Sequence, residues 1–257
     1  MENQKIEVKL LDVWGTDETI ANSAWVSTAK QDKDRTEEDV ARVVSQMIPR
    51  NDTVDHGTPL ETVWLRYWVR CPIYVERQFD KYRMTQQYQD FKVEYEFGSI
   101  GRDNITQNEL SLRYRTMPND YIEVPKDVIE ISNKVNEYLS PEYGEMMLQQ
   151  MNMYSKIVKD LFDAKNQGNI TYDELKRARE FYRGILGTGF FTDMQIVLNA
   201  NALKNILTQR LSPHAQPEAQ EVARLMLKEA LNSEKINVML IRAYEKYDWF
   251  IEHAKLN

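Results

Sequence analysis

In the first 60 residues, hydrophobic and polar positions show the period of a strand in one segment and that of a helix in two others. Apolar side chains alternate with polar ones over residues 5–13, which predicts a strand. Helical spacing follows over residues 18–28 and again over residues 34–49, where an acidic start precedes the apolar positions and a proline ends the run. Residues 51–59 are polar and predict a loop.

Two further strands are predicted in the first half of the chain. Residues 61–75 are dense in β-branched and aromatic side chains, which predicts a long and largely buried strand. Pro72 then marks a bulge or bend within it, and Arg77 and Gln78 close it. Residues 91–97 alternate strictly between apolar and charged types, which predicts a half-exposed strand in a hairpin.

The chain becomes mostly helical after Pro125. The predicted helices cover residues 126–139, 141–166, 172–185, 192–211, 218–232 and 234–252. Thr171 and Glu174 have the spacing of a capping box at the start of one of them. Strands mixed with helices first, and helices alone later, indicate an α+β fold in which a mixed sheet is packed against helices.

Composition narrows the class of protein. The chain has 257 residues, of which 42% are hydrophobic and 28% charged, so we expect one folded domain spanning 1–257 rather than a disordered chain. The net charge of -7 disfavours binding to the phosphate backbone of nucleic acids. One cysteine and three histidines favour neither a disulfide framework nor a metal site. Without a long apolar run we expect no membrane span and a cytoplasmic location, the host cytoplasm if the gene is viral.

Two features have ordinary structural interpretations. Residues 184–189 contain three glycines, but their spacing is the reverse of a dinucleotide fingerprint and they follow a predicted helix. We interpret them as a helix end and a turn between packed helices. Cys71 lies inside a predicted strand, where a buried apolar side chain is a better interpretation than a nucleophile.

A set of polar residues fits this pattern less well. Asparagine is a poor helix former, so asparagines inside a predicted helix are expected to have a partner. The asparagines concerned are Asn199, Asn201 and Asn205. Three separated arginines, Arg113, Arg183 and Arg210, are candidates to converge on a phosphate, because bidentate guanidinium groups can hold a nucleotide without a glycine-rich loop.

Several motifs together resemble one family. Residues 108–114, Asn-Glu-Leu-Ser-Leu-Arg-Tyr, resemble the Asn-Glu-x-Ser-x-Arg-Tyr end of the signature of flavin-dependent thymidylate synthases, the ThyX family. Residues 56–61 are similar to the family's His-x-Thr-Pro-Phe-Glu loop, and residues 72–79 to its Pro-Ile-Phe-Val-x-Arg-Gln-Trp strand. Residues 199–203 resemble Asn-Ala-Arg-Ser-Leu, and residues 212–218 resemble Ser-His-Ala-Gln-x-Glu. The matches occur in the family's order over most of the chain.

The resemblance implies a reaction and its partners. Members of the family make dTMP from dUMP with a methylene group from methylenetetrahydrofolate, while FAD carries electrons supplied by NADPH. It also implies a homotetramer with sites shared between subunits. Two alternatives stay open: a related flavin-dependent hydroxymethyl- or methyltransferase acting on dUMP or dCMP, and a noncatalytic nucleotide-binding protein.

The resemblance also assigns residues. The dUMP set is Gln78, Glu109, Ser111, Arg113, Arg183 and Arg210, with Arg113 and Arg183 on the phosphate and Arg210 on the uracil ring. The FAD set is Ser27, Thr58, Glu61, Lys81, Tyr82, Arg83, Asn199, Asn201, Asn205 and His214. His56 is placed near the flavin, where folate or nicotinamide approaches. The candidate catalytic residues are Ser111, Arg210 and His56, with Ser111 orienting the nucleotide rather than attacking it.

The chain departs from the family at two places. The family signature has Arg-His-Arg, seven residues, and then Ser. Two registers remain open here: residues 81–83, Lys-Tyr-Arg, with a β-hairpin insertion at about 84–104, or residues 101–103, Gly-Arg-Asp. We favour the first, which puts Tyr82 in the place of the histidine. The second departure is Asn201, where the family has an arginine that meets the FAD phosphates.

Overall fold

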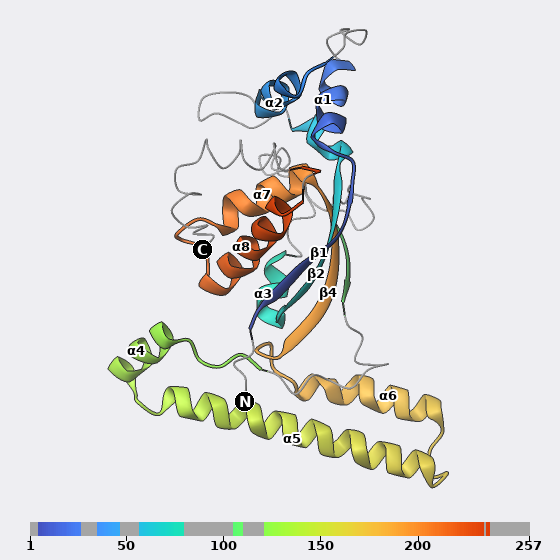
Figure 1. Cartoon of the computed structure of the whole chain (residues 1–257). Helices are drawn as coiled ribbons and strands as arrows, with labels where there is room; N and C mark the ends of the chain where they lie inside the picture. The colour runs from blue at the N-terminus through green and yellow to red at the C-terminus, as the bar shows by residue number, and fades with distance from the viewer. Residues whose placement is uncertain are drawn as a thin grey trace, which may run out of the picture. The chain divides into compact units, whose positions relative to one another are not determined.

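The computed structural model describes residues 5–26, 35–46, 57–79, 105–109, 121–233 and 235–236, with the side chains of residues 46 and 105–109 left undescribed. These residues form the α+β fold that the sequence predicts, with a sheet of strand order β1-β2-β4-β3 (Figure 1). The chain divides into two compact units. We call Met1–Lys5, Cys71–Glu76 and Glu109–Asp193 the helical unit, and Ile6–Arg70, Arg77–Asn108 and Met194–Asn257 the sheet unit.

Two antiparallel strands begin the sheet unit. β1, Glu7–Trp14, pairs with β2, Trp64–Pro72, in a register that runs from Glu7 opposite Arg70 to Trp14 opposite Trp64. Every second residue of β2 from Leu65 onward is buried, as the period of two in a pleated strand requires. Burying an apolar side chain of this size contributes roughly 1.5–3 kcal/mol to folding. β3, Ile105–Glu109, is the strand at the other edge.

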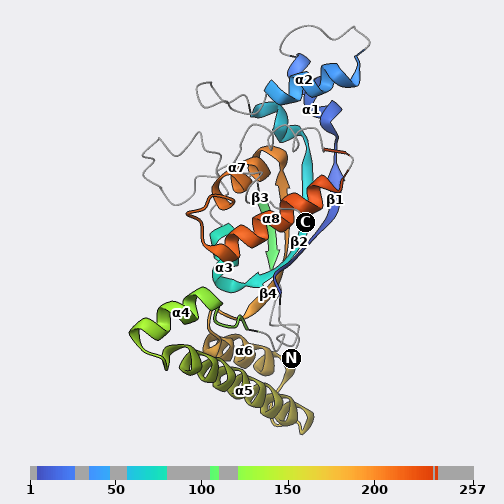
Figure 2. The ribbon, with the colours of Figure 1, turned by 60° about the vertical axis from the view of Figure 1, so that its left-hand side comes forward.

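Helices α7, Ala200–Arg210, and α8, Pro217–Leu231, pack on one another, and α8 also packs on β1 (Figures 1 and 2). The buried residues of α8 recur at three- and four-residue spacing, which gives the helix one apolar side. Polar contacts fix its position, since Leu10 N donates to the Glu229 carboxylate at 3.0 Å and the Tyr67 hydroxyl donates to the Met226 carbonyl at 3.2 Å. The predicted helix over residues 218–232 is confirmed.

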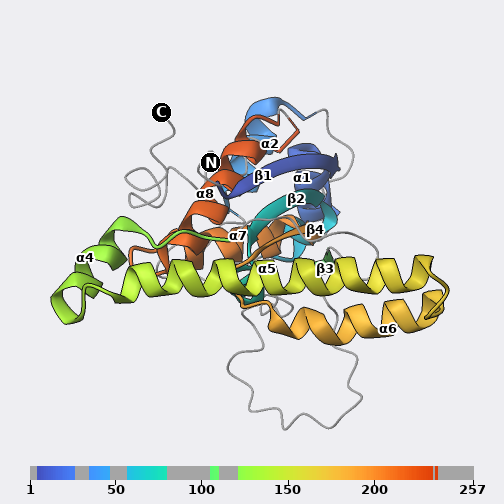
Figure 3. The same ribbon diagram turned by 90° about the horizontal axis from the view of Figure 1, so that it is seen from below.

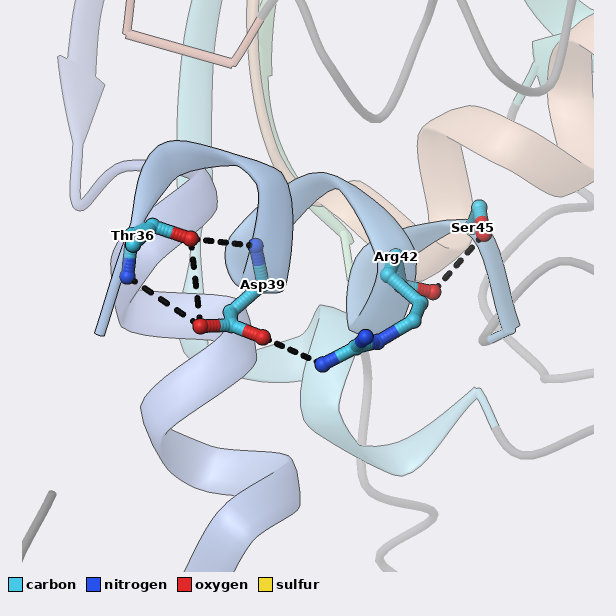
Figure 4. A network of polar contacts seen from close by, with 4 residues as sticks. All are labelled: Thr36, Asp39, Arg42 and Ser45. Atoms are coloured by element: carbon cyan, nitrogen blue, oxygen red, sulfur yellow. Dashed lines mark hydrogen bonds and ion pairs between the residues drawn. The ribbon is translucent and has the colours of Figure 1, made fainter.

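The two predicted N-terminal helices are also confirmed. They are α1, Asp17–Val26, and α2, Glu37–Gln46. Thr36 and Asp39 cap the start of α2 reciprocally, and Asp39 also pairs with Arg42 (Figure 4). Hydrogen bonds from the Thr36 backbone and hydroxyl hold the pKa of Asp39 below its usual value.

The predicted long strand over residues 61–75 is wrong at both ends. A short 3₁₀ helix, η1 (Thr58–Thr62), precedes β2, and a helix, α3 (Ile73–Phe79), follows it directly. Pro72 is the last residue of the strand rather than a bulge, because proline has no N–H to continue the hydrogen-bond ladder. Arg77 and Gln78 therefore lie on a helix, not at the end of a strand.

The predicted helix over residues 192–211 is a strand followed by a helix. β4, Phe191–Asn199, buries Met194, Ile196 and Leu198 at a period of two, and α7 begins only at Ala200. The Asn199 side chain caps α7 by accepting from Ala202 N at 2.8 Å, so it does not sit in a helix interior. The segment before β4 also differs from the prediction, since a 3₁₀ turn, η4 (Arg183–Ile185), leads into a strand and not into a second helix.

The helical unit contains α4, Lys126–Val135, α5, Leu139–Asn166, and α6, Tyr172–Tyr182. Each matches a predicted helix, with ends shifted by a few residues, and α5 and α6 run side by side (Figure 3). The predicted capping box is present at the start of α6. A core of Met147, Tyr154 and Phe190 holds the unit together.

The remaining elements predicted from the sequence, the strand over residues 91–97, the hairpin at about 84–104 and nearly all of the helix over 234–252, lie outside the described residues. Among the helices that the structure does describe, none combines the length and the apolar character needed to cross a membrane.

Candidate active site

Helix α7 carries buried polar side chains along one side. Asn201, Lys204 and Asn205 are each less than a tenth exposed. With 100° of rotation per residue they share a side of the helix, while Leu203 and Leu207 bury the opposite side. The start of α7 is tied to the residue between η1 and β2, because Ala200 N donates to the Val63 carbonyl at 2.9 Å. A few polar groups in an otherwise apolar lining are typical of ligand sites, so this side of α7 is a candidate ligand site.

The 3₁₀ helix η1 packs against α7 and contributes a carboxylate. Asn201 Nδ2 donates to Glu61 Oε1 at 3.3 Å. Asn201 also lies close to the backbone at Gly57, where a Cβ atom would come within 2.7 Å of Asn201 Oδ1. That Oδ1 atom is buried and has no hydrogen-bond partner among the described residues. As an amide oxygen, it can accept a hydrogen bond from a donor group.

The structure brings part of the predicted FAD set together. Thr58 and Glu61 lie on η1, and Asn201 and Asn205 lie on the α7 helix that η1 contacts. Asn199 belongs to the same region, but its side chain is used as the helix cap. His214 lies in the exposed loop after α7, where its backbone N–H donates to Ser212 Oγ at 3.4 Å.

Part of the predicted dUMP set also meets in the sheet unit. Arg210 Nη2, at the end of α7, donates to the Gln78 carbonyl at 3.3 Å. The Gln78 side chain donates through Nε2 to Oε1 of Gln216, just before α8. Gln78, Arg210 and Gln216 are all half-buried. These contacts form a connected polar cluster, which we call the Gln78 cluster.

Lys204 and Gln216 are residues of these two regions that sequence reasoning did not assign. Gln216 lies within the Ser-x-His-Ala-Gln segment whose resemblance was noted, so the motif itself was the available signal. Lys204 is the buried cation among the described residues of the sheet unit, and the available signal was a charged residue among the apolar and asparagine positions at the start of α7.

The other predicted site residues are not brought together by the structure. Arg183 is exposed on η4 of the helical unit, and Glu109 ends β3 with its side chain undescribed. The rest lie outside the described residues: Ser27, His56, Lys81, Tyr82, Arg83, residues 101–103, Ser111 and Arg113. The convergence of three arginines on one phosphate therefore stays a prediction.

The fold has a solved counterpart. A crystal structure described as the UMP/dUMP methylase PolB from Streptomyces cacaoi, bound with 5-Br dUMP, superposes with a TM-score of 0.62 and covers 96% of this chain and 97% of its own. Sequence identity is 19%, so this likeness concerns the fold.

The sequence match extends over nearly the whole described region. Residues 9–233 match the family described as thymidylate synthase complementing protein, and the chain belongs to this family. Curated relatives include the flavin-dependent thymidylate synthase of Thermotoga neapolitana, 26% identical over 84% of this chain and 81% of the relative. That of Rickettsia bellii is 25% identical over 86% of this chain and 70% of the relative.

Proposed function

We propose that the protein is a flavin-dependent thymidylate synthase. It would transfer the methylene carbon of methylenetetrahydrofolate to C5 of dUMP, and the hydride of NADPH would complete the methyl group. The C5 hydrogen would leave as a proton, and this proton and one from solvent would be taken up by the two folate nitrogens that held the methylene carbon. The products are dTMP, tetrahydrofolate and NADP⁺. The observation that carries the proposal is the buried polar side of α7 opposite Glu61, where the Asn201 acceptor has no partner among the residues that the structure describes, in a chain of this family.

The residues on η1 and α7 fit a flavin dinucleotide. Asn201 Oδ1 is a buried acceptor suited to a hydroxyl or amine of the cofactor, not to a phosphate oxygen, which is itself an acceptor. Lys204, one turn further along α7, would supply positive charge for the diphosphate in place of the arginine that other members have at the position of Asn201. FAD, when bound, supplies the redox chemistry, and the protein supplies position and charge.

The Gln78 cluster fits the base of the nucleotide. The Arg210 guanidinium is a donor suited to a uracil carbonyl, and the Gln78 side chain offers an acceptor for the imide N–H. Cys71, the one cysteine of the chain, is fully buried in β2 and is not placed to attack a pyrimidine. The residues are therefore suited to holding and orienting the nucleotide rather than to forming a bond with it.

Product mass tests the proposal. Protein supplied with FAD, NADPH, methylenetetrahydrofolate and dUMP should yield a product heavier by one CH₂ unit, and omission of FAD or the folate should stop the reaction. UMP and dCMP belong in parallel reactions, because the solved counterpart is described as a UMP/dUMP methylase. A gain of CH₂O would indicate a hydroxymethyltransferase instead.

A colour test separates the cofactor from the reaction. Purified protein should be yellow, or become yellow with added FAD, and should bleach with NADPH. Protein that takes up no FAD would contradict the flavin assignment. Protein that binds dUMP without turnover under complete conditions would indicate a noncatalytic nucleotide-binding role.

A further inference from the structure

We propose that the outer edge of β1 is a latent pairing surface for a second copy of the chain, and that the end of α8 holds this edge closed. Among the strands that the structure describes, β1 lies at one edge of the sheet, with β2 on its other side. An edge strand presents backbone N–H and carbonyl groups that a strand of another chain can use. The inference concerns association between copies and is independent of the proposed reaction.

One hydrogen bond shows which backbone groups of β1 face outward. Leu10 N donates to the Glu229 carboxylate of α8 at 3.0 Å, so this N–H faces away from β2. In an antiparallel pair, alternate residues turn both backbone groups toward the neighbouring strand, and the residues between them turn both groups away. Val8, and Ile6 just before the strand, precede Leu10 in steps of two and share its outward direction.

A second contact covers the edge beyond a register shift in β1. Leu10 pairs with Tyr67 before the shift. Val13 pairs with Leu65 after it. Tyr67 and Leu65 are two positions apart on β2 and have the same orientation, so the backbone of Val13 also faces outward. The Val13 carbonyl accepts from Lys235 Nζ at 3.1 Å. The end of α8 and the segment after it therefore occupy outward groups on both sides of the shift.

The sequence of the strand is complementary to itself. Residues 6–10 read Ile-Glu-Val-Lys-Leu. An antiparallel copy centred on Val8 places Glu7 opposite Lys9 on both sides of the centre and sets apolar residues opposite one another. Opposite charges across an antiparallel pair are favourable, and both side chains are exposed. This two-fold match favours a second copy of the chain over an unrelated strand.

The Glu229 contact competes directly with this pairing. In the register centred on Val8, Leu10 lies opposite Ile6 of the second copy, and the Leu10 N–H would donate to the carbonyl of that residue. The same N–H is already taken by the Glu229 carboxylate. A hydrogen bond to a charged acceptor is stronger than one to a neutral carbonyl, so the edge stays closed while Glu229 is in place.

Light scattering over a series of protein concentrations tests the inference. Glu229→Met keeps an apolar stem and removes the acceptor, and the mass should rise about twofold above that of the wild type at high concentration. Glu229→Gln keeps an acceptor and should retain the wild-type mass. Exposed Lys228→Met is the matched control. Glu229→Ala takes the place of Glu229→Met if that variant does not fold.

A charge swap identifies the surface that associates. Adding Lys9→Glu to the Glu229→Met variant should return the mass to the wild-type value, because Glu7 then faces a like charge across the pair. Adding Glu7→Lys as well should bring the association back, which aggregation of unfolded protein would not do. Wild-type mass of the folded Glu229 variant at all concentrations would overturn the inference. Association that Lys9→Glu leaves unchanged would place the contact on another surface and would overturn it too.

Discussion

Asn201 donates to the Glu61 carboxylate at 3.3 Å, and this bond joins η1 to the polar side of α7. Asn201 is 6% exposed, and Glu61 is half-buried. The amide thus gives its donor to a neighbouring anion, while its acceptor has no partner within the described part of the chain. Substitutions that change the donor should affect both the packing of η1 and the binding of the flavin.

Asn201→Asp should destabilise the protein at neutral pH. It replaces the donor with a carboxylate facing Glu61, and we expect the free energy of unfolding to fall by about 1–3 kcal/mol. The like charge raises the pKa of the carboxyl pair in the folded state. The penalty is therefore full at neutral pH and shrinks as the pH falls through that raised pKa. Thermal melts across this range, with exposed Asn152→Asp as the control, measure it; a penalty that grows toward acidic pH would contradict the assignment.

Gly57→Ala should be destabilising because of space rather than backbone conformation. The added Cβ would lie 2.7 Å from Asn201 Oδ1 and 3.0 Å from its Cγ and Nδ2, which costs about 1–3 kcal/mol of overpacking. Adding Asn201→Ala should recover part of the loss, and a double-mutant cycle from urea unfolding measures the coupling.

Gly144→Ala is the control, because no heavy atom lies within 4 Å of the added Cβ. In the interior of α5 it should stabilise by up to about 1 kcal/mol. Independent effects of Gly57 and Asn201 would contradict the close approach.

The sequence correctly predicted the helices and strands in which one hydrophobic period runs without interruption from one end to the other. β1, α1, α2, α5 and α8 were found because strand or helix spacing runs through each segment without interruption, and in α8 the buried residues recur at three- and four-residue spacing. The predicted helix over 192–211 failed because a strand runs directly into a helix there, with no loop residues between Asn199 and Ala200. A polar residue at such a junction is ambiguous, since an asparagine can interrupt a helix or cap one.

The sequence predicted only those residues of the candidate site that lie in short motifs. The resemblance placed Glu61 and Asn201 in one set, and the structure shows them bonded. It gave no role to Gln216, which lies 138 residues from Gln78 in the sequence and contacts it through its side chain. Contacts of this kind depend on tertiary structure, which no local pattern encodes.

The capping box of α6 makes a pH prediction. Glu174 accepts from the Thr171 backbone N–H at 2.7 Å and from its hydroxyl at 2.9 Å, and these bonds hold the pKa of Glu174 below its usual value. A lowered folded-state pKa gives stability that is present above the ordinary glutamate pKa and is lost as the pH falls through the lowered one. Glu174→Gln should thus melt earlier than wild type at neutral pH and converge with it in acid. Exposed Glu145→Gln is the control, and a constant difference at all pH values would contradict the account.

Lys204→Met should distinguish between flavins. FAD carries a diphosphate and riboflavin does not, so a cation that serves the diphosphate should matter only for FAD. We expect FAD affinity to fall at least about tenfold, and riboflavin affinity to change little, in fluorescence titrations. Lys204→Arg keeps the charge and should retain most of the FAD affinity. Equal losses for FAD and riboflavin would show that Lys204 acts only by supporting α7.

Arg210→Ala should weaken nucleotide binding while leaving the fold intact. Arg210 is half-buried at the end of α7, and its Nη2 donates to the Gln78 carbonyl, so the substitution releases the end of α3 and, in the proposed site, removes a donor for the base. A charged hydrogen bond contributes about 1.5–3 kcal/mol, which corresponds to roughly 10- to 100-fold in the Kd for dUMP. Arg210→Lys should be intermediate, because an ammonium keeps the charge without the planar fork. Exposed Arg177→Ala is the control. Wild-type dUMP affinity of Arg210→Ala in calorimetry would remove Arg210 from the nucleotide site, and the Gln78 cluster would then need another ligand.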